Sequence, residues 1–145
     1  MQKTLFLVIP FLSLTFFGCS SPESNNNGKP KQFPKPGTII TSAEMPVTDD
    51  PLNHFTFSVK VIADSNTSGG VYDVEAAYGP NTSLGKFTMP KGGEDFKPII
   101  RKGAMPYTYI IGFQAPGDTA FYDYFEVSSS KFATKMQYLK AYNYN

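Results

Sequence analysis

Apolar and polar side chains alternate one by one along several short segments of this chain. The clearest case is residues 55–63, which read FTFSVKVIA. Successive side chains of a β-strand point to opposite faces, so this pattern predicts a strand with one face in a core and the other toward solvent. Residues 72–78, YDVEAAY, repeat the pattern after a turn-forming segment that reads DSNTSGG. Because no segment shows sustained helical spacing, we predict a fold made of strands.

Glycine, proline, asparagine and aspartate separate the other apolar segments at intervals of about ten residues. Residues 107–115, YTYIIGFQA, are apolar on both faces and are predicted to form a central strand. Pro98 lies within the strand expected at residues 96–101 and weakens it. The expected strands cover residues 38–43, 55–63, 72–78, 84–89, 96–101, 107–115, 119–127 and 132–142. Seven to eight short strands at this spacing are typical of an antiparallel β-sandwich, which is the fold class that we predict.

The segment from Asp118 to Tyr124 reads DTAFYDY and resembles the D-x-A-x-Y-x-C run at the start of strand F in immunoglobulin domains. In that family the tyrosine, here Tyr122, is buried and bonds through its hydroxyl to upstream backbone. Tyr124 stands at the cysteine position, and the chain has no tryptophan. The resemblance implies an immunoglobulin-like sandwich, and a transthyretin-like or fibronectin-type sandwich is the alternative.

The alternation in residues 119–127 leaves two orientations of this strand open. In one, Phe121 and Phe125 face the core, which also turns Asp123 inward, where an unpaired carboxylate is costly. In the other, Tyr122 and Tyr124 face the core. We expect the second orientation, with Phe121 or Phe125 covered by a neighbouring loop or by a partner.

The N-terminal segment resembles the signal peptide of bacterial lipoproteins. Lys3 precedes an apolar run from residue 5 to residue 17, which is too short to span a bilayer, and the run ends at Gly18-Cys19. A small residue before a cysteine at this place resembles a lipobox. The resemblance implies that residues 1–18 are removed and that Cys19 carries the lipid anchor. The alternative is an ordinary signal peptide with an incidental cysteine.

The resemblance to a lipobox also predicts where in the cell the protein lies. Cys19 is the only cysteine, so we expect no disulfide in the mature chain. Ser20 after the cysteine resembles lipoproteins that are sorted to the outer membrane of Gram-negative cells. We therefore expect a protein that is held to the outer membrane by its lipid, facing the periplasm or the cell surface.

Residues 19–37 are predicted to form a lipidated, disordered tether. After Cys19 they read SSPESNNNGKPKQFPKPG, which offers too little apolar surface to offset the entropy of ordering. Alternating lysine and proline favour an extended spacer. In the alternative interpretation, the lysines hold the tether against anionic lipid headgroups. Residues 38–145 then form the β-sandwich domain.

Few side chains suited to catalysis occur in the chain. His54 is the only histidine, and it follows a polar loop with Asp49, Asp50 and Asn53. Carboxylate and amide oxygens are ligands for hard cations, but such residues also satisfy their own backbone in loops, and we favour this second interpretation. We expect no catalytic residue, no metal and no cofactor.

Two further features bear on substrates and partners. Asp73 and Glu75 share one strand face, as a glycosidase pair would, but we expect them to be solvent-facing residues that keep the sheet soluble. The formal net charge is +1, and a nucleic-acid-binding domain would concentrate basic side chains on one face. We therefore expect neither an enzyme nor a nucleic-acid partner.

Tyrosines gather near the C-terminus, and three of them are the candidate ligand-binding aromatics: Tyr138, Tyr142 and Tyr144. Tyrosine is also a good strand residue with a buried ring and a hydroxyl at the rim. We expect a non-enzymatic binding or accessory module of a cell-envelope complex. The alternatives are a structural lipoprotein of a secretion or surface-attachment machine and a glycan-binding surface lipoprotein. An exposed row of rings would favour a glycan, and an apolar patch or an open edge strand would favour a protein partner.

Overall fold

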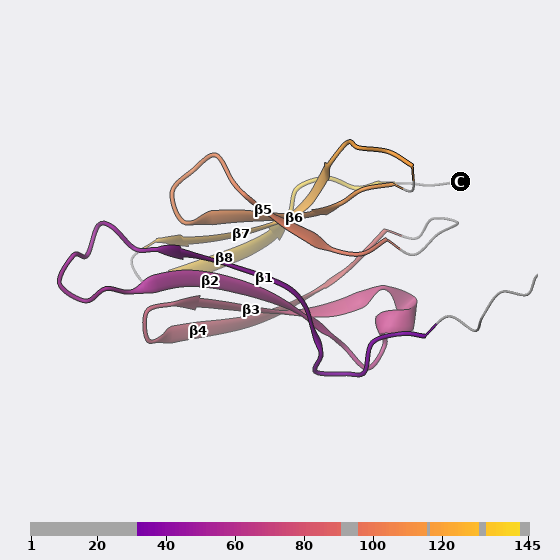
Figure 1. The fold of residues 1–145 in the computed structure, drawn as a ribbon, viewed down its shortest axis with the longest axis horizontal. Helices are drawn as coiled ribbons and strands as arrows, with labels where there is room; N and C mark the ends of the chain where they lie inside the picture. The colour runs from indigo at the N-terminus through magenta and orange to yellow at the C-terminus, as the bar shows by residue number, and fades with distance from the viewer. Residues whose placement is uncertain (1–31, 91–95, 116, 131–132, 143–145) are drawn as a thin grey trace, which may run out of the picture. The chain divides into compact units, whose positions relative to one another are not determined.

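A computed structural model describes residues 32–90, 96–115, 117–130 and 133–142, which belong to a compact unit that starts at Gln32. Eight strands form two sheets that lie one above the other (Figure 1). The strands are β1 Ile39–Pro46, β2 Thr56–Ala63, β3 Val71–Tyr78, β4 Asn81–Thr88, β5 Ile99–Lys102, β6 Thr108–Phe113, β7 Tyr122–Ser130 and β8 Ala133–Tyr138. A 3₁₀ turn, η1, covers Thr67–Gly69. The predicted all-β antiparallel sandwich is confirmed.

Each sheet is built from consecutive strands. The first has the order β1-β2-β3-β4 and the second β5-β6-β7-β8, and every neighbouring pair is antiparallel. In an immunoglobulin domain, Greek-key connections place strands from both halves of the chain in each sheet. The strand order here is therefore a pair of meanders and differs from the immunoglobulin order that the DTAFYDY segment implied.

The core lies between the inner faces of the two sheets. β2 buries every second side chain, as its alternation predicts. β6 is largely buried on both faces, because Tyr109, Ile111 and Phe113 lie in the core and the Phe121 ring lies against Gly112 on the outer face. Aromatic rings join the two sheets, with ring centroids 5.4 Å apart for Phe57 and Tyr109 and 5.2 Å apart for Phe87 and Phe125. Such pairs contribute about 0.5–1.5 kcal/mol beyond their buried area.

A β-bulge in β7 decides which side chains of this strand face the core. Ile111 pairs with Phe125 and Gly112 pairs with Asp123, so Tyr124 is an extra residue on the bulged strand. As a result Tyr124 and Phe125 are both buried, with 8% and 3% of their surface exposed. The expectation that Tyr124 faces inward is confirmed. The expectation for Phe125 is wrong, because no loop or partner is needed to cover a ring that lies in the core.

Phe121 lies on the outer side of the second sheet, against the backbone of Gly112. A Cβ atom on Gly112 would overlap both the Phe121 ring and the carbonyl oxygen of Tyr122. The Arg101 guanidinium lies 4.2 Å from the centre of the Phe121 ring. Two strands of the same sheet, β5 and β6, thus contribute contacts that partly cover Phe121.

Tyr122 does not form the expected tyrosine corner. Its hydroxyl donates to the Asp118 carboxylate at 2.7 Å. The acceptor is therefore a side chain four residues upstream, whereas a tyrosine corner bonds to the backbone. The ring is half-buried and stacks on Phe113 with centroids 5.5 Å apart.

Several segment boundaries also differ from the sequence expectation, among them the start of β4 and the end of the tether. Tyr78 pairs with Asn81, so a two-residue turn joins β3 to β4, and β4 begins three residues earlier than residue 84. Gly79 adopts a φ of 56° in this turn, which glycine tolerates without a steric cost. At the other boundary, the Gly37 N–H donates to the Ala63 carbonyl at 2.8 Å, so the last part of the expected tether already bonds to the sandwich.

Candidate functional site

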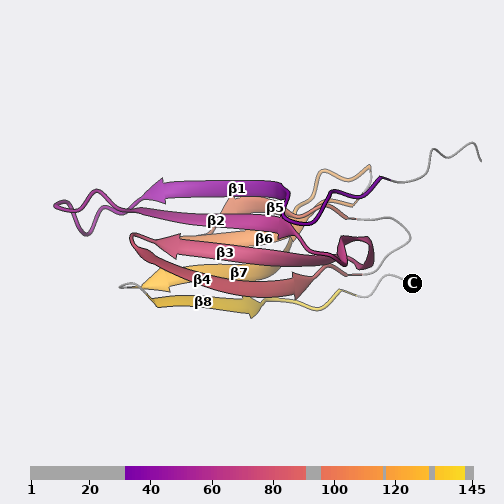
Figure 2. The same ribbon diagram turned by 90° about the horizontal axis from the view of Figure 1, so that it is seen from below.

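The sandwich has two long sides, and each side is formed by one edge strand from each sheet. β1 lies over β5 on one side, and β4 lies beside β8 on the other (Figure 2). An edge strand presents unpaired backbone N–H and C=O groups, and proteins protect such edges with prolines, bulges, charges or short strands. The two sides differ in how well they are protected.

The side formed by β1 and β5 carries several protective features. Pro46 ends β1, and the register of β1 shifts between Ile39 and Thr41. β5 has four residues, of which the last two, Arg101 and Lys102, are charged and exposed. A proline has no N–H to offer, and a short, charged or irregular edge pairs poorly with another strand.

The side formed by β4 and β8 lacks most of these features. Neither strand contains a proline or a carboxylate, and each contains one lysine, Lys86 or Lys135. Both strands keep a regular register with their neighbours. Leu84 stands in the middle of β4 with 79% of its surface exposed. We therefore take this side as the candidate functional site.

The register of β4 shows which backbone groups face the open edge. The Met89 N–H donates to the Gly70 carbonyl, which makes Val71 and Thr88 a pair without mutual hydrogen bonds. The N–H and C=O groups of such a residue point away from the partner strand. Bonded and non-bonded pairs alternate, so the same groups point outward at three further residues of β4: Thr82, Leu84 and Lys86.

At Thr88, the outward-pointing backbone groups bond to tyrosine hydroxyls from the second sheet. The Thr88 N–H donates to the Tyr138 hydroxyl at 3.0 Å, and the Tyr124 hydroxyl donates to the Thr88 carbonyl at 2.6 Å. Burial raises the pKa of Tyr124, which keeps its hydroxyl protonated as a donor. The backbone of Thr88 is thus satisfied, and the accessible part of the edge runs from Thr82 to Lys86.

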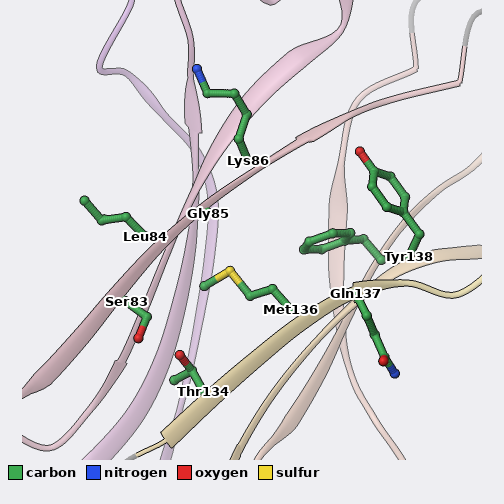
Figure 3. A pocket seen from close by; sticks show the side chains of 9 residues that line it. Ser83, Leu84, Gly85, Lys86, Thr134, Met136, Gln137 and Tyr138 are labelled. Atoms are coloured by element: carbon green, nitrogen blue, oxygen red, sulfur yellow. The ribbon is translucent and has the colours of Figure 1, made fainter.

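A slot of about 400 Å³ opens between the two edge strands (Figure 3). The β4 residues that face it, Ser83 and Gly85, are small, whereas Met136 and Tyr138 reach into it from β8. The Met136 side chain points toward β4, and a Cβ atom on Gly85 would overlap its sulfur. Phe125 also lines the slot. Leu84, Phe125, Met136 and Tyr138 give the slot apolar surface, and polar side chains line the rest of it.

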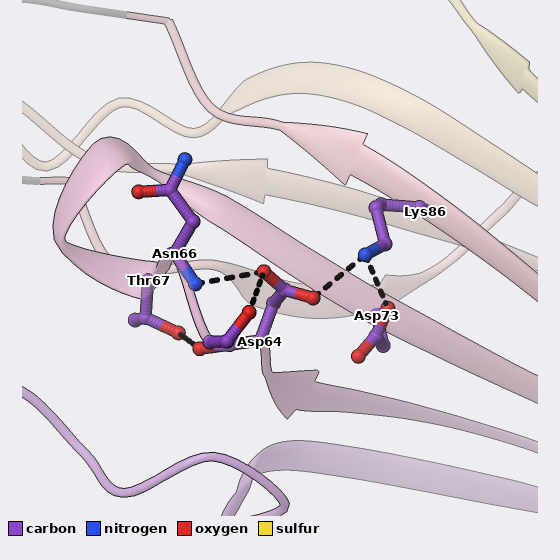
Figure 4. Close-up of polar contacts among 6 residues, drawn as sticks. Asp64, Asn66, Thr67, Asp73 and Lys86 are labelled. Carbon is purple, nitrogen blue, oxygen red and sulfur yellow. Dashed lines mark hydrogen bonds and ion pairs between the residues drawn. The ribbon is translucent and has the colours of Figure 1, made fainter.

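The lysine of β4 belongs to a separate network on the outer face of the first sheet (Figure 4). Lys86 Nζ lies 2.6 Å from Asp64 Oδ2 and 3.3 Å from Asp73 Oδ1. Asp64 also accepts the Asn66 N–H at 2.8 Å. The hydrogen bond from Lys86 is the main cause that lowers the pKa of Asp64. This network fixes the DSNTSGG turn beside β4.

Asp73 and Glu75, the candidate carboxylate pair, each form an ion pair with a different lysine. Asp73 contacts Lys86, and Glu75 Oε1 lies 2.6 Å from Lys60 Nζ. Both carboxylates lie on the partly exposed outer face of β3, which agrees with the solvent-facing interpretation.

The polar loop between β1 and β2 is held by its own hydrogen bonds. The Asn53 amide donates to both Asp50 oxygens, at 3.0 and 2.9 Å. Asp49 accepts hydrogen bonds from the hydroxyls of Tyr78 and Tyr107. His54 is exposed. Within the described ranges, no group of three or more His, Cys, Asp or Glu side chains is placed to hold a metal ion.

The two candidate aromatics that the structure describes, Tyr138 and Tyr142, both pack against the sandwich. Tyr138 has 52% of its surface exposed, but its hydroxyl is bonded to Thr88 and its ring meets Phe125 edge-on at 5.1 Å. The half-buried Tyr142 donates its hydroxyl to the Asp123 carbonyl at 2.8 Å. Tyr144 and Cys19 lie outside the described residues.

Sequence reasoning missed Leu84 and Met136 as functional candidates. The available signal was Leu84 itself, a large apolar residue on the strand face that also carries the polar Thr82 and Lys86. This signal was weak because the sequence does not show that β4 is an edge strand.

No stretch of helix in the described part of the chain is both long and apolar enough to cross a membrane. Comparisons with protein-family models, curated proteins and solved structures find no match for this chain.

Proposed function

We propose that this protein is a lipid-anchored, non-enzymatic binding module of the bacterial outer membrane, and that its sandwich docks a partner protein on the β4–β8 side. The observation that supports this docking surface is the contrast between the two long sides of the sandwich. One side has a proline, an irregular register and a short charged strand, and the other has a regular edge with an exposed leucine and a slot that is partly lined by apolar side chains.

The glycan alternative receives less support from the same residues. Stacking on a sugar needs an exposed ring face. The Tyr138 ring instead meets Phe125 edge-on at 5.1 Å, and the half-buried Tyr142 ring meets Phe113 edge-on at 5.3 Å. Their arrangement supports a role in closing the C-terminal end of the second sheet.

The anchor is tested by labelling. Only a thiol accepts the diacylglycerol, so we expect Cys19→Ser to abolish incorporation of a radioactive fatty acid. Wild-type protein that takes up no label would refute the lipoprotein assignment.

The docking surface is tested by co-purification from detergent-solubilised envelope. Leu84→Lys places a charge in the middle of the proposed surface, and Leu52→Lys provides a matched control because Leu52 is 89% exposed in the β1–β2 loop. We expect the same partner with wild type and Leu52→Lys, and its loss with Leu84→Lys. Equal recovery with both variants would place the contact elsewhere.

A further inference from the structure

We infer that the partner contributes an extended peptide strand that pairs with β4, and that a bulky apolar side chain of this strand enters the slot between β4 and β8. This inference rests on the proposed function, because it names the kind of segment that the docking surface binds. The recognised segment has uncharged, apolar side chains at alternate positions.

The backbone of β4 provides the hydrogen bonds for such a strand. The N–H and C=O groups of Thr82, Leu84 and Lys86 point to the open edge. In the same strand, Thr88 is already satisfied by Tyr124 and Tyr138. An added strand therefore pairs with the segment from Thr82 to Lys86 and ends before the two tyrosines. Addition of a strand to an open sheet edge is a common mode of peptide recognition.

The slot provides selectivity for side chains. A strand added beside β4 continues the first sheet, so its side chains point alternately into the sandwich and out of it. The inward ones reach the slot between Ser83 and Met136, which Phe125 also lines, and the space over Gly85 is already taken by the Met136 sulfur. The outward ones lie beside Leu84 and cover it.

A second copy of this chain fits the surface less well. Antiparallel pairing of two β4 strands through Leu84 would bring Ser83 and Gly85 of the other copy toward the slot, which would stay unfilled. The surface is also small. A strand of eight residues beside a sandwich about 10 Å thick presents an area on the order of 300 Å². Stable dimers bury about 800 Å² per partner. An area of this size suits a peptide strand.

The test uses the soluble chain from Ser20 onward, which retains the whole compact unit. The probe is a short capped peptide with leucine and threonine alternating between terminal lysines. Its control is the same peptide with N-methyl groups on alternate residues, which removes edge hydrogen bonds and keeps the apolar side chains. Amide hydrogen exchange is read at Leu84 and Lys86, with the β1 residues Ser42 and Glu44 as references.

We expect the peptide to slow exchange at Leu84 and Lys86 and to leave Ser42 and Glu44 unchanged, and the N-methylated peptide to protect neither pair. Ser83→Leu fills the slot from β4 and should weaken binding at least about tenfold, which corresponds to about 1.4 kcal/mol. The matched variant Ser42→Leu on β1 should bind like wild type. If Ser83→Leu does not fold, Thr134→Leu replaces it in the experiment, because this variant fills the slot from β8.

Several outcomes would overturn the inference. One is that millimolar peptide does not slow amide exchange at Leu84 and Lys86. Another is that Ser83→Leu and Ser42→Leu weaken peptide binding equally. A third is a concentration-dependent dimer that Leu84→Lys dissociates, which would make a second copy the occupant. If the peptide fails while Leu84→Lys still loses the envelope partner, strand addition is wrong and the proposed docking function stands.

Discussion

Gly112 lies at a place in the second sheet that has no room for a side chain. The Tyr122 carbonyl oxygen and the Phe121 ring both occupy the space that a Cβ atom on Gly112 would take. The absence of a side chain there lets the bulged strand β7 approach β6, and the Phe121 ring covers the bare backbone.

We expect Gly112→Ala to lower the free energy of unfolding by about 1–3 kcal/mol, the usual scale for overpacking. Urea melts give this value. Because one of the two overlapping groups is a backbone carbonyl, adding Phe121→Ala should not restore stability. A Gly112→Ala protein as stable as wild type would show that β7 moves away from β6 at no cost.

Phe125 and Tyr122 lie on either side of the bulge and should respond differently to truncation. Phe125 is buried against Phe87, so Phe125→Ala should cost about 3–5 kcal/mol. The Tyr122 hydroxyl bonds to an exposed carboxylate, and water can replace it in Tyr122→Phe, which should change the urea midpoint little. A large loss in Tyr122→Phe would argue for a buried tyrosine corner instead.

The loop between β1 and β2 is tied to the second sheet by Tyr107. Its hydroxyl accepts the N–H groups of Thr48 and Asp49, at 2.9 and 3.2 Å, and donates to the Asp49 carboxylate. Tyr107 has a φ of 47°, an unfavourable conformation for a bulky residue. These three bonds help to hold the residue in this conformation.

The loop contact predicts a dependence of stability on pH. The hydrogen bond from Tyr107 is the main cause that lowers the pKa of Asp49. A carboxyl with a lowered pKa stabilises the fold above its ordinary pKa of about 3.9, and this contribution is lost as the pH falls toward the folded-state value. We expect Tyr107→Phe to lower the urea midpoint near neutral pH and to make its decrease on acidification shallower.

Urea melts at about pH 6 and about pH 3 measure this difference. Tyr138→Phe is the control, because its hydroxyl bonds to a backbone N–H and to no carboxylate in the described structure. Its acid dependence should equal that of wild type. Identical acid dependence in Tyr107→Phe and wild type would contradict a role for this hydrogen bond in the titration of Asp49.

For the whole molecule, the boundary between tether and sandwich determines where the chain can be shortened. Residues 20–31 contain no large apolar side chain, so soluble chains that start at residue 20 and at residue 32 should melt at the same temperature. A chain that starts at residue 38 loses the bond from Gly37 to Ala63 and should melt a few degrees lower. Calorimetry of the three chains checks both statements. A lower melting temperature for the chain that starts at residue 32 would show that residues 20–31 pack on the sandwich.

The sequence by itself determined the local properties of this protein. Period-two alternation identifies β2 and β3, and turn residues between apolar segments identify most of the remaining strands and the sandwich class. These features depend on residues that are neighbours in the chain. The resemblance of Gly18-Cys19 to a lipobox is local in the same sense, and the lipid anchor stays a prediction.

Only the tertiary structure decided the facing of β7 and the position of the candidate site. Alternation alone could not place both Tyr124 and Phe125 inward, because the bulge arises from pairing with Ile111 and Gly112 on another strand. Likewise, Leu84 is exposed because the meander order leaves β4 without a second neighbour. Strand order, bulges and open edges are set by contacts between distant residues, and a pattern read along the chain does not contain them.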